Sequence, residues 1–317
     1  MLIPARGETA MTRVATIGEC MIELRHTDGE TLKLGFGGDT LNTAVYLARL
    51  GREGGVRVDY VTALGDDAYS DGMLAAWAAE GVGTDLVARL PGRLPGLYII
   101  RTDEKGERSF TYFRSAAAAR DMLREGRDAQ LAERLAGYAC VYVSGITLSI
   151  LDDEHRRKLM AVLDRLRGAG TRIAFDSNYR PAGWPTIEAA GAWMTEAWRR
   201  CDIALPTLDD EQRLFGDGDA EACVARLRRF GMGEIVLKLG SEGSVVWSGD
   251  APALTRVPPV EVANVVDTTA AGDSFNAGYL YGRLTGKDPA ASADFGSRLA
   301  AAKIQHPGAI MPRDAMP

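Results

Sequence analysis

Short apolar segments alternate with segments of helical periodicity through most of this chain, and this alternation restricts its fold more than any other feature. After residue 130, strands are predicted at 138–143 and 171–176, and helices at 152–168 and 187–199. Strands that alternate with helices form a mostly parallel sheet with helices on both faces, so we predict an α/β fold of three layers. Further helices are expected at 39–51 (with Gly51 at its end), 70–81, 128–136, 208–215, 219–230, 272–285 and 288–305, and further strands at 13–19, 58–65, 202–206, 234–240 and 244–249.

Residues 96–114 interrupt this alternation. The stretch "GLYIIRTDEKGERSFTYFR" has two alternating segments around a charged turn, which is the pattern of a β-hairpin. Two more short strands are predicted at 20–25 and 31–36. Together the two pairs could form a small sheet, so we expect a central sheet with a smaller β-sheet outside it.

Composition and charge argue against several classes of protein. The chain has 317 residues and a net charge of −6 without a cluster of Lys and Arg, so nucleic acid is not an expected partner. Its longest uncharged run, 135–151, is shorter than the ~20 apolar residues of a membrane helix, and the chain does not start with a signal core. Its Cys and His residues lack the spacing of a zinc site or a disulfide framework, which favours the cytoplasm. Residues 1–12 are expected to be a disordered extension before one domain at 13–317.

The stretch "VVDTTAAGDSF" (265–275) joins an extended, β-branched segment to a helix-like one. Its small residues therefore lie at a predicted helix N-terminus, where free backbone N–H groups and the helix dipole favour an anion. Asp273 falls in the first turn of that helix. The alternative is that Asp273 only caps the helix, which Asp does well.

The stretch "FGGDTLNTA" (36–44) offers a second candidate site. Gly37 and Gly38 permit a tight bend before a helix, and Asp39, Thr40 and Asn42 could contact a hydroxylated ligand. The alternative is a turn with a helix cap. The stretch lacks the GxGxxG of a dinucleotide-binding turn, and "GRLTGKD" (282–288) lacks the spacing of a P-loop.

Three further segments carry polar groups in suggestive places. In the hairpin, Tyr98, Tyr112 and Arg114 could share a face, and a guanidinium grips a carboxylate through two hydrogen bonds, which suits a sugar acid. In "FDSNYRP" (175–181), Asn178 and Arg180 follow a strand, and the carboxyl ends of strands bind ligands in α/β sheets. The alternatives are an exposed amphipathic hairpin and a polar loop.

The stretch "LKLGSEGS" (237–244) is the fifth segment. Lys238, Gly240 and Gly243 could hold a nucleotide. A tight glycine turn between two strands is the alternative.

Taken together, these segments resemble the ribokinase-like carbohydrate kinases of the phosphofructokinase-B type. The C-terminal signature of that family is close to D-T-x-G-A-G-D-x-F, and this chain has "DTTAAGDSF", with Ala270 in place of the first Gly. The N-terminal signature, a Gly-Gly turn with an Asn four residues after the second Gly, matches "GGDTLN". The resemblance covers about residues 13–312. Within the family, segments such as "FTYFRS", "DSNYRP" and "LPTLDDE" are most similar to those of 2-keto-3-deoxygluconate kinases.

The resemblance implies a ribokinase-like α/β/α domain with a β-sheet lid formed by about 20–36 and 96–114. It also implies ATP and Mg²⁺ as cofactors, a sugar acid as substrate, and a homodimer or higher homo-oligomer paired through the lid, and it raises the question of a monovalent cation. The reaction would phosphorylate 2-keto-3-deoxygluconate at its 6-hydroxyl. Kinases of 2-keto-3-deoxygalactonate, fructose, ribose or a nucleoside are alternatives, as is a non-catalytic sugar-acid sensor on the same fold.

The same resemblance implies roles for individual residues. Asp273 would be the general base, ionised at neutral pH with an ordinary pKa of about 3.9. Because backbone N–H groups form the anion hole, we expect Ala270 to serve there with a negative φ. The family's Asn-x-x-Glu motif becomes Thr207 to Asp210 here, so no metal ligand is assigned. The implied anion hole is Ala270, Ala271 and Gly272. The sugar acid would contact Gly37, Gly38, Asp39, Thr40, Leu41, Asn42, Tyr98, Tyr112, Arg114, Arg180 and Asp273. The nucleotide would contact Asn178, Arg180, Lys238, Gly240, Ser241, Glu242, Gly243 and the three anion-hole residues.

Overall fold

The computed structural model describes residues 11–102, 108–124, 126–249 and 253–317. Its main sheet has eight strands in the order β14-β13-β12-β11-β10-β9-β1-β4. The strands from β12 to β4 in this order are parallel, and β13 and β14 extend the sheet antiparallel at one edge. The predicted extension at 1–12 lies mostly outside the described residues. The strands are β1 (Thr12–Ile17), β4 (Val56–Val61), β9 (Cys140–Ser144), β10 (Arg172–Asp176), β11 (Ile203–Ala204), β12 (Glu234–Lys238), β13 (Ser244–Ser248) and β14 (Thr255–Val257).

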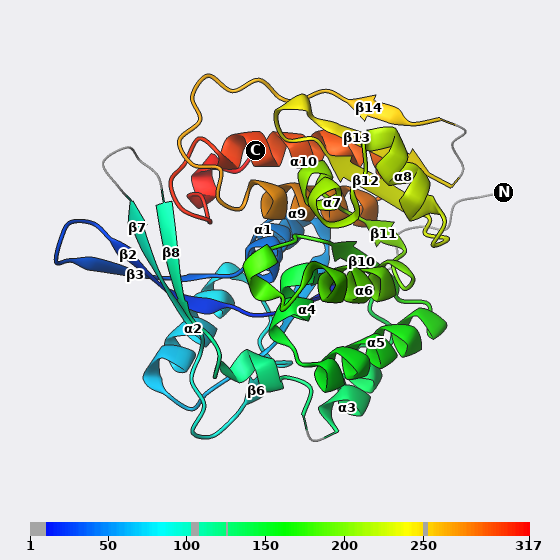
Figure 1. The fold of residues 1–317 in the computed structure, drawn as a ribbon. Coiled ribbons are helices and arrows are strands. Elements are labelled where there is room, and N and C mark those ends of the chain that lie inside the picture. Colours follow the sequence, from blue (N-terminus) through cyan, green and yellow to red (C-terminus); the bar gives the residue numbers. More distant parts are fainter. Residues whose placement is uncertain (1–10, 103–107, 125, 250–252) are drawn as a thin grey trace.

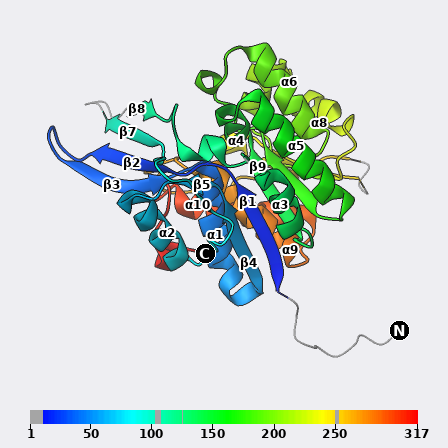
Figure 2. The ribbon, with the colours of Figure 1, turned by 90° about the horizontal axis from the view of Figure 1, so that it is seen from below.

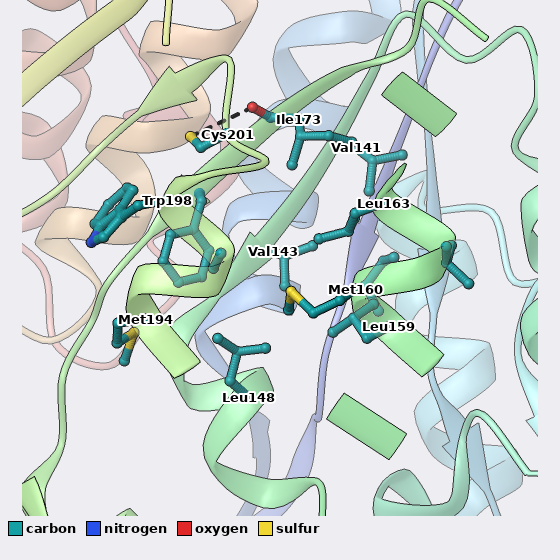
Figure 3. Packing of buried hydrophobic residues seen from close by; sticks show 14 of the residues in the cluster. Val141, Val143, Leu148, Leu159, Met160, Leu163, Ile173, Met194, Trp198 and Cys201 are labelled. Atoms are coloured by element: carbon teal, nitrogen blue, oxygen red, sulfur yellow. Dashed lines mark hydrogen bonds between the residues drawn. The ribbon is translucent and has the colours of Figure 1, made fainter. Parts of the chain in front are cut away.

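Helices cover both faces of this sheet, because successive side chains of each strand point to opposite faces. In β9, Val141 and Val143 pack into one hydrophobic core, whereas Cys140 and Tyr142 pack into the other. Figure 3 shows the first core, where Val143 lies among Leu148, Met160 and Leu163. The helices of that face are α3 (Arg127–Arg134), α4 (Gly145–Ile150), α5 (Asp153–Gly168), α6 (Ile187–Trp198), α7 (Leu208–Phe215) and α8 (Ala220–Arg228); those of the other are α1 (Asp39–Gly54), α2 (Ala68–Glu80), α9 (Ala271–Leu284) and α10 (Pro289–Lys303).

A second sheet of four strands extends from one side of the main body (Figures 1 and 2). Its order is β3-β2-β7-β8, so the predicted hairpin pairs with the strands of 20–36 as expected. Leu32, Leu34 and Phe113 on this sheet are 40%, 48% and 59% exposed. Its strands are β2 (Met21–His26), β3 (Leu32–Gly37), β7 (Leu97–Thr102) and β8 (Arg108–Phe113); β5 (Ala63–Leu64) pairs separately with β6 (Ala88–Arg89), and short 3₁₀ turns are η1 (Ala118–Asp121), η2 (Pro181–Gly183), η3 (Gly240–Glu242) and η4 (Arg313–Ala315).

The expected end of the first helix is wrong. Helix α1 continues past Gly51 to Gly54, and it ends at Gly55, which has φ 68°. Gly51 serves a different purpose, because a Cβ atom there would lie 2.2 Å from the carbonyl oxygen of Val56. The glycine therefore allows the helix to pack closely against the following strand, rather than ending it.

The four cysteines, Cys20, Cys140, Cys201 and Cys223, are buried and unbonded. Burial raises the pKa of each thiol, so all four stay protonated at neutral pH. Among the helices of the described residues, none is both long and apolar enough to cross a membrane.

Candidate active site

Two helix N-termini meet at the carboxyl ends of the parallel strands. Helix α1 begins at Asp39 and helix α9 begins at Ala271, and the two helices pack against each other in one core. A Thr43 hydroxyl on α1 donates a hydrogen bond of 3.2 Å to the carbonyl oxygen of Asp273 on α9. The "GGDTLN" and "DTTAAGDSF" segments, 231 residues apart at Asn42 and Asp273, therefore form one site.

The Gly-Gly turn is explained by close approach, not by a positive φ. A Cβ atom at Gly37 would lie 2.2 Å from the Tyr98 hydroxyl oxygen, and one at Gly38 would lie 2.1 Å from the Glu19 carbonyl oxygen. At Gly38 such a contact would force two backbone segments apart, and at Gly37 it would displace the Tyr98 side chain. The two glycines thus let the smaller sheet lie directly against the start of α1.

Ala270 contradicts the predicted backbone conformation. It has φ 59° and ψ 18°, in the left-handed region, and it is the N-cap residue of α9. This conformation costs about 1–2 kcal/mol for a residue with a Cβ atom. The turn holds Ala270 there, since its carbonyl oxygen accepts the Ser274 N–H at 2.9 Å while the Ala271 N–H donates to the Thr268 carbonyl at 3.1 Å. Ala270 therefore carries strain that the usual Gly would avoid.

The start of α9 presents free backbone donors. Within the described residues, the N–H groups of Ala270, Gly272 and Asp273 donate to no acceptor. The Ala271 N–H, expected to line the anion hole, is already used by Thr268. Lys238 adds positive charge beside these N–H groups. Its Nζ lies close to Gly272, 3.7 Å from the position that a Cβ atom would take there. Free donors, a helix dipole and an ammonium group together make this loop suited to an anion.

Asp273 is buried and is not an ordinary carboxylate. Its pKa rises from about 3.8 to about 7, mainly because burial disfavours the charge and also because Asp39 and Asp176 carry like charges nearby. The expectation of an unperturbed pKa is therefore wrong. The Asn42 side-chain amide donates to Asp273 Oδ2 at 2.9 Å and lowers the pKa, but less than burial raises it.

The start of α1 brings a second carboxylate to the site. Asn178 Nδ2 donates to Asp39 Oδ2 at 2.8 Å, and burial raises the pKa of Asp39. Asn178 has φ 33°, which Asn tolerates. Two neighbours differ from the expectation of a ligand contact: Thr40 is buried with its hydroxyl 3.1 Å from the Tyr60 hydroxyl, and Leu41 packs in the hydrophobic core.

Lys238 is held by a network that the sequence did not reveal. Its Nζ donates to Asp176 Oδ2 at 2.6 Å and to Asn276 Oδ1 at 3.1 Å. The Asn276 amide donates in turn to Asp176 Oδ2 at 2.7 Å and to the Tyr142 hydroxyl at 3.1 Å. Asp176 ends β10 and Asn276 follows Asp273 by one helical turn, but nothing in either stretch indicates that they share a lysine.

Residues of the smaller sheet surround the other side of the site. Tyr98 and Tyr112 lie directly opposite each other in β7 and β8, so they share a face as predicted. The Tyr98 hydroxyl donates to Glu23 at 2.5 Å, and Tyr112 is 52% exposed. Arg114, expected to meet the carboxylate of a sugar acid, is ion-paired with the buried carboxylate of Glu19.

Arg180 remains more accessible than Arg114. Its side chain is 58% exposed, and its Nη1 lies 3.5 Å from Asp210 Oδ1. Asp210 also accepts the Tyr179 N–H at 3.1 Å, and burial raises its pKa. Asp210 is the last residue of the segment 207–210, which corresponds to the family's Asn-x-x-Glu motif.

A pocket of about 560 Å³ adjoins the start of α9. The turn between β12 and β13 lines it with Lys238, Gly240, Ser241 and Gly243, four of the residues that the sequence analysis expects to contact a nucleotide, whereas Glu242 is not part of its lining. Gly243 has φ 86°, and a Cβ atom there would lie 2.3 Å from the Val257 carbonyl oxygen. Ala271 and Gly272 of the predicted anion hole also line this pocket. The remaining walls, which the sequence did not indicate, are Thr207, Pro259, Val260, Glu261, Val262, Val265, Thr268, Phe275, Ser297, Ala300, Ala301 and Ile304.

Comparison with known proteins identifies the family. The family model described as "pfkB family carbohydrate kinase" matches residues 11–316. The 2-dehydro-3-deoxygluconokinase of Escherichia coli strain K12 is 46% identical over 307 residues, covering 96% of this chain and 99% of that protein. The enzyme of the same name from Haemophilus influenzae is 40% identical over 306 residues, covering 96% and 98%. A crystal structure of a PfkB protein from Polaromonas sp. JS666 superposes with a TM-score of 0.82 at 26% identity, covering 93% and 96%. The chain therefore belongs to the pfkB family of carbohydrate kinases.

Proposed function

We propose that this kinase is a 2-dehydro-3-deoxygluconokinase, which transfers the γ-phosphoryl group of ATP to the 6-hydroxyl of 2-keto-3-deoxygluconate. The observation that carries the proposal is a buried carboxylate, Asp273, beside free backbone donors at the N-terminus of α9. This carboxylate lies between a pocket for the nucleotide and a wall of polar side chains for the sugar. The identity to relatives of that name over nearly the whole chain supports the substrate.

Asp273 acts as the general base. Its carboxylate accepts the proton of the 6-hydroxyl while that oxygen bonds to the γ-phosphorus, and the bond from the γ-phosphorus to the bridging oxygen of ADP breaks. The products are the 6-phosphate and ADP, and the proton passes from Asp273 to water afterwards. Because the pKa of Asp273 is raised to about 7, mainly by burial, the base is only partly ionised at neutral pH.

The transferring phosphoryl group needs charge stabilisation more than covalent chemistry. The amides of Ala270 and Gly272, with that of Asp273, supply donors that are already oriented, and this orientation costs nothing at the moment of reaction. Lys238 supplies the positive charge on the nucleotide side. The Ala271 amide, bonded to Thr268, fixes the turn that aims the others.

The pocket beside Gly240 and Gly243 is suited to the adenosine of ATP, because its outer walls carry Val260, Val262 and Ile304. The carboxylates of Asp176 and Asp210 lie near Lys238 and offer the oxygen ligands that Mg²⁺ prefers. They would hold an ion that binds together with ATP. Mg²⁺, when bound, neutralises charge on the β- and γ-phosphates.

The polar wall on the sugar side consists of Asp39, Asn42 and Asn178. The side-chain oxygen of Asn42, Oδ1, is buried without a hydrogen-bond donor among the described residues, and a sugar hydroxyl would satisfy it. Arg180 is accessible for the carboxylate of a sugar acid, and Arg114 contributes through donors that Glu19 does not use. Gly37 and Gly38 bring Tyr98 and Tyr112 over this wall.

A panel of acceptors tests the substrate. Release of ADP is measured with 2-keto-3-deoxygluconate, 2-keto-3-deoxygalactonate, fructose, ribose and a nucleoside, and we expect the highest kcat/KM for the first. A higher kcat/KM for fructose or ribose would refute the sugar-acid assignment. A sugar-acid sensor would bind the acid in calorimetry, but no acceptor would lead to the formation of ADP from ATP.

We also propose that residues 13–317 form one kinase domain in which the smaller sheet is a lid that pairs two subunits. The exposed side chains of Leu34 and Phe113 support this, because apolar residues on a sheet with unpaired edges favour association with another chain. Sedimentation should give a dimer or higher oligomer for the wild type and a monomer for Phe113→Asp. The matched control is Tyr69→Asp, which changes an exposed aromatic residue on α2. A monomeric wild type at micromolar concentration would contradict the pairing.

A further inference from the structure

Lys303 is the last residue of α10, and its side chain is completely buried. An ammonium group out of water is unstable unless polar partners replace its hydration shell. Lys303 Nζ donates to the Asp267 carbonyl oxygen at 2.6 Å and to the His306 carbonyl oxygen at 3.4 Å, and it lies 4.0 Å from Asp267 Oδ1. The group thus occupies a cage of backbone oxygens with one carboxylate.

This cage lies directly before the loop that carries the free amides. The Ile304 carbonyl accepts the N–H groups of Val266 and Asp267 at 2.8 and 3.0 Å. The Asp267 carboxylate accepts the Thr269 N–H at 2.8 Å through Oδ1 and the Gly308 N–H at 2.8 Å through Oδ2. Asp267 is therefore held from both sides, and only two residues separate it from Ala270.

Carbonyl oxygens that converge on one positive charge are also the ligands that replace the water around K⁺. An ammonium group carries the same charge, with three donors that can satisfy such oxygens. A dissociable K⁺ at this position would need an open space among these oxygens. Here the Nζ of Lys303 fills the cage, so these residues do not fit a dissociable ion.

We propose that Lys303 is a built-in monovalent cation: its ammonium group holds the Asp267 carbonyl and thereby keeps the loop of Ala270 and Gly272 oriented toward the transferring phosphoryl group. This proposal rests on the proposed kinase function. Lys303 touches neither substrate, so it is a positioning residue. Its consequence is that turnover needs no added K⁺.

The first test uses the wild-type enzyme and therefore does not depend on a variant that folds. Activity is measured at constant ionic strength in tetramethylammonium chloride, and then with K⁺ or NH₄⁺ at 100 mM in its place. We expect kcat to change by less than twofold. Activation of several-fold by K⁺ would overturn the proposal, because it would require a separate cation site.

The second test empties the cage. In Lys303→Ala, we expect kcat to fall by about 10- to 100-fold with a smaller change in the KM for the sugar, and K⁺ or NH₄⁺ to restore at least a fifth of wild-type kcat. Lys303→Met removes the charge but keeps the volume, so it is the matched control and no cation should restore it. An unchanged kcat in Lys303→Ala, or a loss that neither ion restores, would make Lys303 a structural residue only.

A melting experiment separates this proposal from the assigned reaction. K⁺ should raise the Tm of Lys303→Ala by several degrees, but not that of the wild type or of Lys303→Met, in the absence of any substrate. If no acceptor is phosphorylated, the proposed function fails while the Tm comparison still decides the role of Lys303. Equal K⁺ effects on all three proteins would overturn the built-in cation.

Discussion

Replacement of Asp273 by Asn should stabilise the protein while it removes most of the activity, and the gain should depend on pH. The carboxyl group has a pKa of about 7 in the folded protein against 3.8 for an ordinary Asp. Below about pH 4 it is protonated in both the folded and the unfolded chain. Between pH 4 and 7 the unfolded chain releases the proton and the folded chain keeps it, so folding becomes less favourable as the pH rises.

The size of the effect follows from the two pKa values. Their difference of about 3 corresponds to about 4 kcal/mol of lost stability once the pH exceeds 7, of which about 1.5–2 kcal/mol is already lost at pH 5. Asn cannot ionise and does not carry this penalty. The stability of Asp273→Asn relative to the wild type should therefore increase by about 2–3 kcal/mol from pH 5 to pH 8. Constant effects, such as a changed hydrogen bond from Asn42, cancel in this difference.

Urea unfolding of the apoprotein at pH 5 and pH 8 measures this quantity. Asp294→Asn is the matched control, because Asp294 is a partly exposed carboxylate on α10 paired with Arg298, and its ΔΔG should stay within about 0.5 kcal/mol at both pH values. A ΔΔG for Asp273→Asn that is equal at pH 5 and pH 8 would show that Asp273 is ionised throughout, and the electrostatic reasoning would fail.

The same variant tests the chemistry. We expect a loss of roughly 10²–10⁴-fold in kcat, the usual contribution of a general base. Wild-type kcat/KM should rise about tenfold per pH unit below pH 7 and level off above it, because the ionised carboxylate is the active form. Near-normal turnover in Asp273→Asn would place the base elsewhere.

Two other substitutions test the backbone of the site. Ala270→Gly should leave kcat within about threefold and raise the free energy of unfolding by about 0 to 1 kcal/mol, because the relief of the left-handed strain is partly offset by the greater freedom of Gly in the unfolded chain. Denaturant unfolding measures this free energy. A decrease of more than about 1 kcal/mol would contradict the strain at Ala270. Gly243→Ala should cost at least about 1–3 kcal/mol. It should also raise the KM for ATP more than that for the sugar, because its Cβ atom would push against the backbone of Val257 and Pro259 beside the pocket proposed for the nucleotide. Gly218→Ala, in open space, is the control for the second variant and should behave as wild type.

Much of the fold could be predicted because each element follows from local periodicity. Helix α7 begins and ends at the predicted residues 208 and 215, and the paired strands of the smaller sheet follow from the alternation in 96–114. Gly51 misled the prediction because a glycine that permits close packing and a glycine that ends a helix have the same sequence letter. Only the position of the Val56 carbonyl distinguishes the two.

The site was less predictable, because its properties depend on burial and on contacts between distant segments. Asp273 was recognisable from its motif, but its raised pKa comes mainly from its burial away from water and also from the charges of Asp39 and Asp176. Arg114 looked free to bind a carboxylate, yet Glu19, 95 residues earlier, supplies one from within the chain. The expected φ of Ala270 was wrong because the turn around it, rather than the preference of Ala, decides the conformation.

The four buried cysteines can serve as probes of how often different parts of the structure open. A thiol reagent can reach each one only when the structure around it opens, so labelling rates report the free energy of that opening. Cys140, Cys201 and Cys223 lie in or beside the main sheet and should react only as fast as the whole molecule unfolds. Cys20 lies between β1 and the smaller sheet, and Gly38 packs against its backbone. If Cys20 is labelled faster than the other three cysteines, its rate would therefore measure movement of the smaller sheet. Slower labelling of Cys20 with a sugar acid bound would show that the substrate closes the smaller sheet over the site.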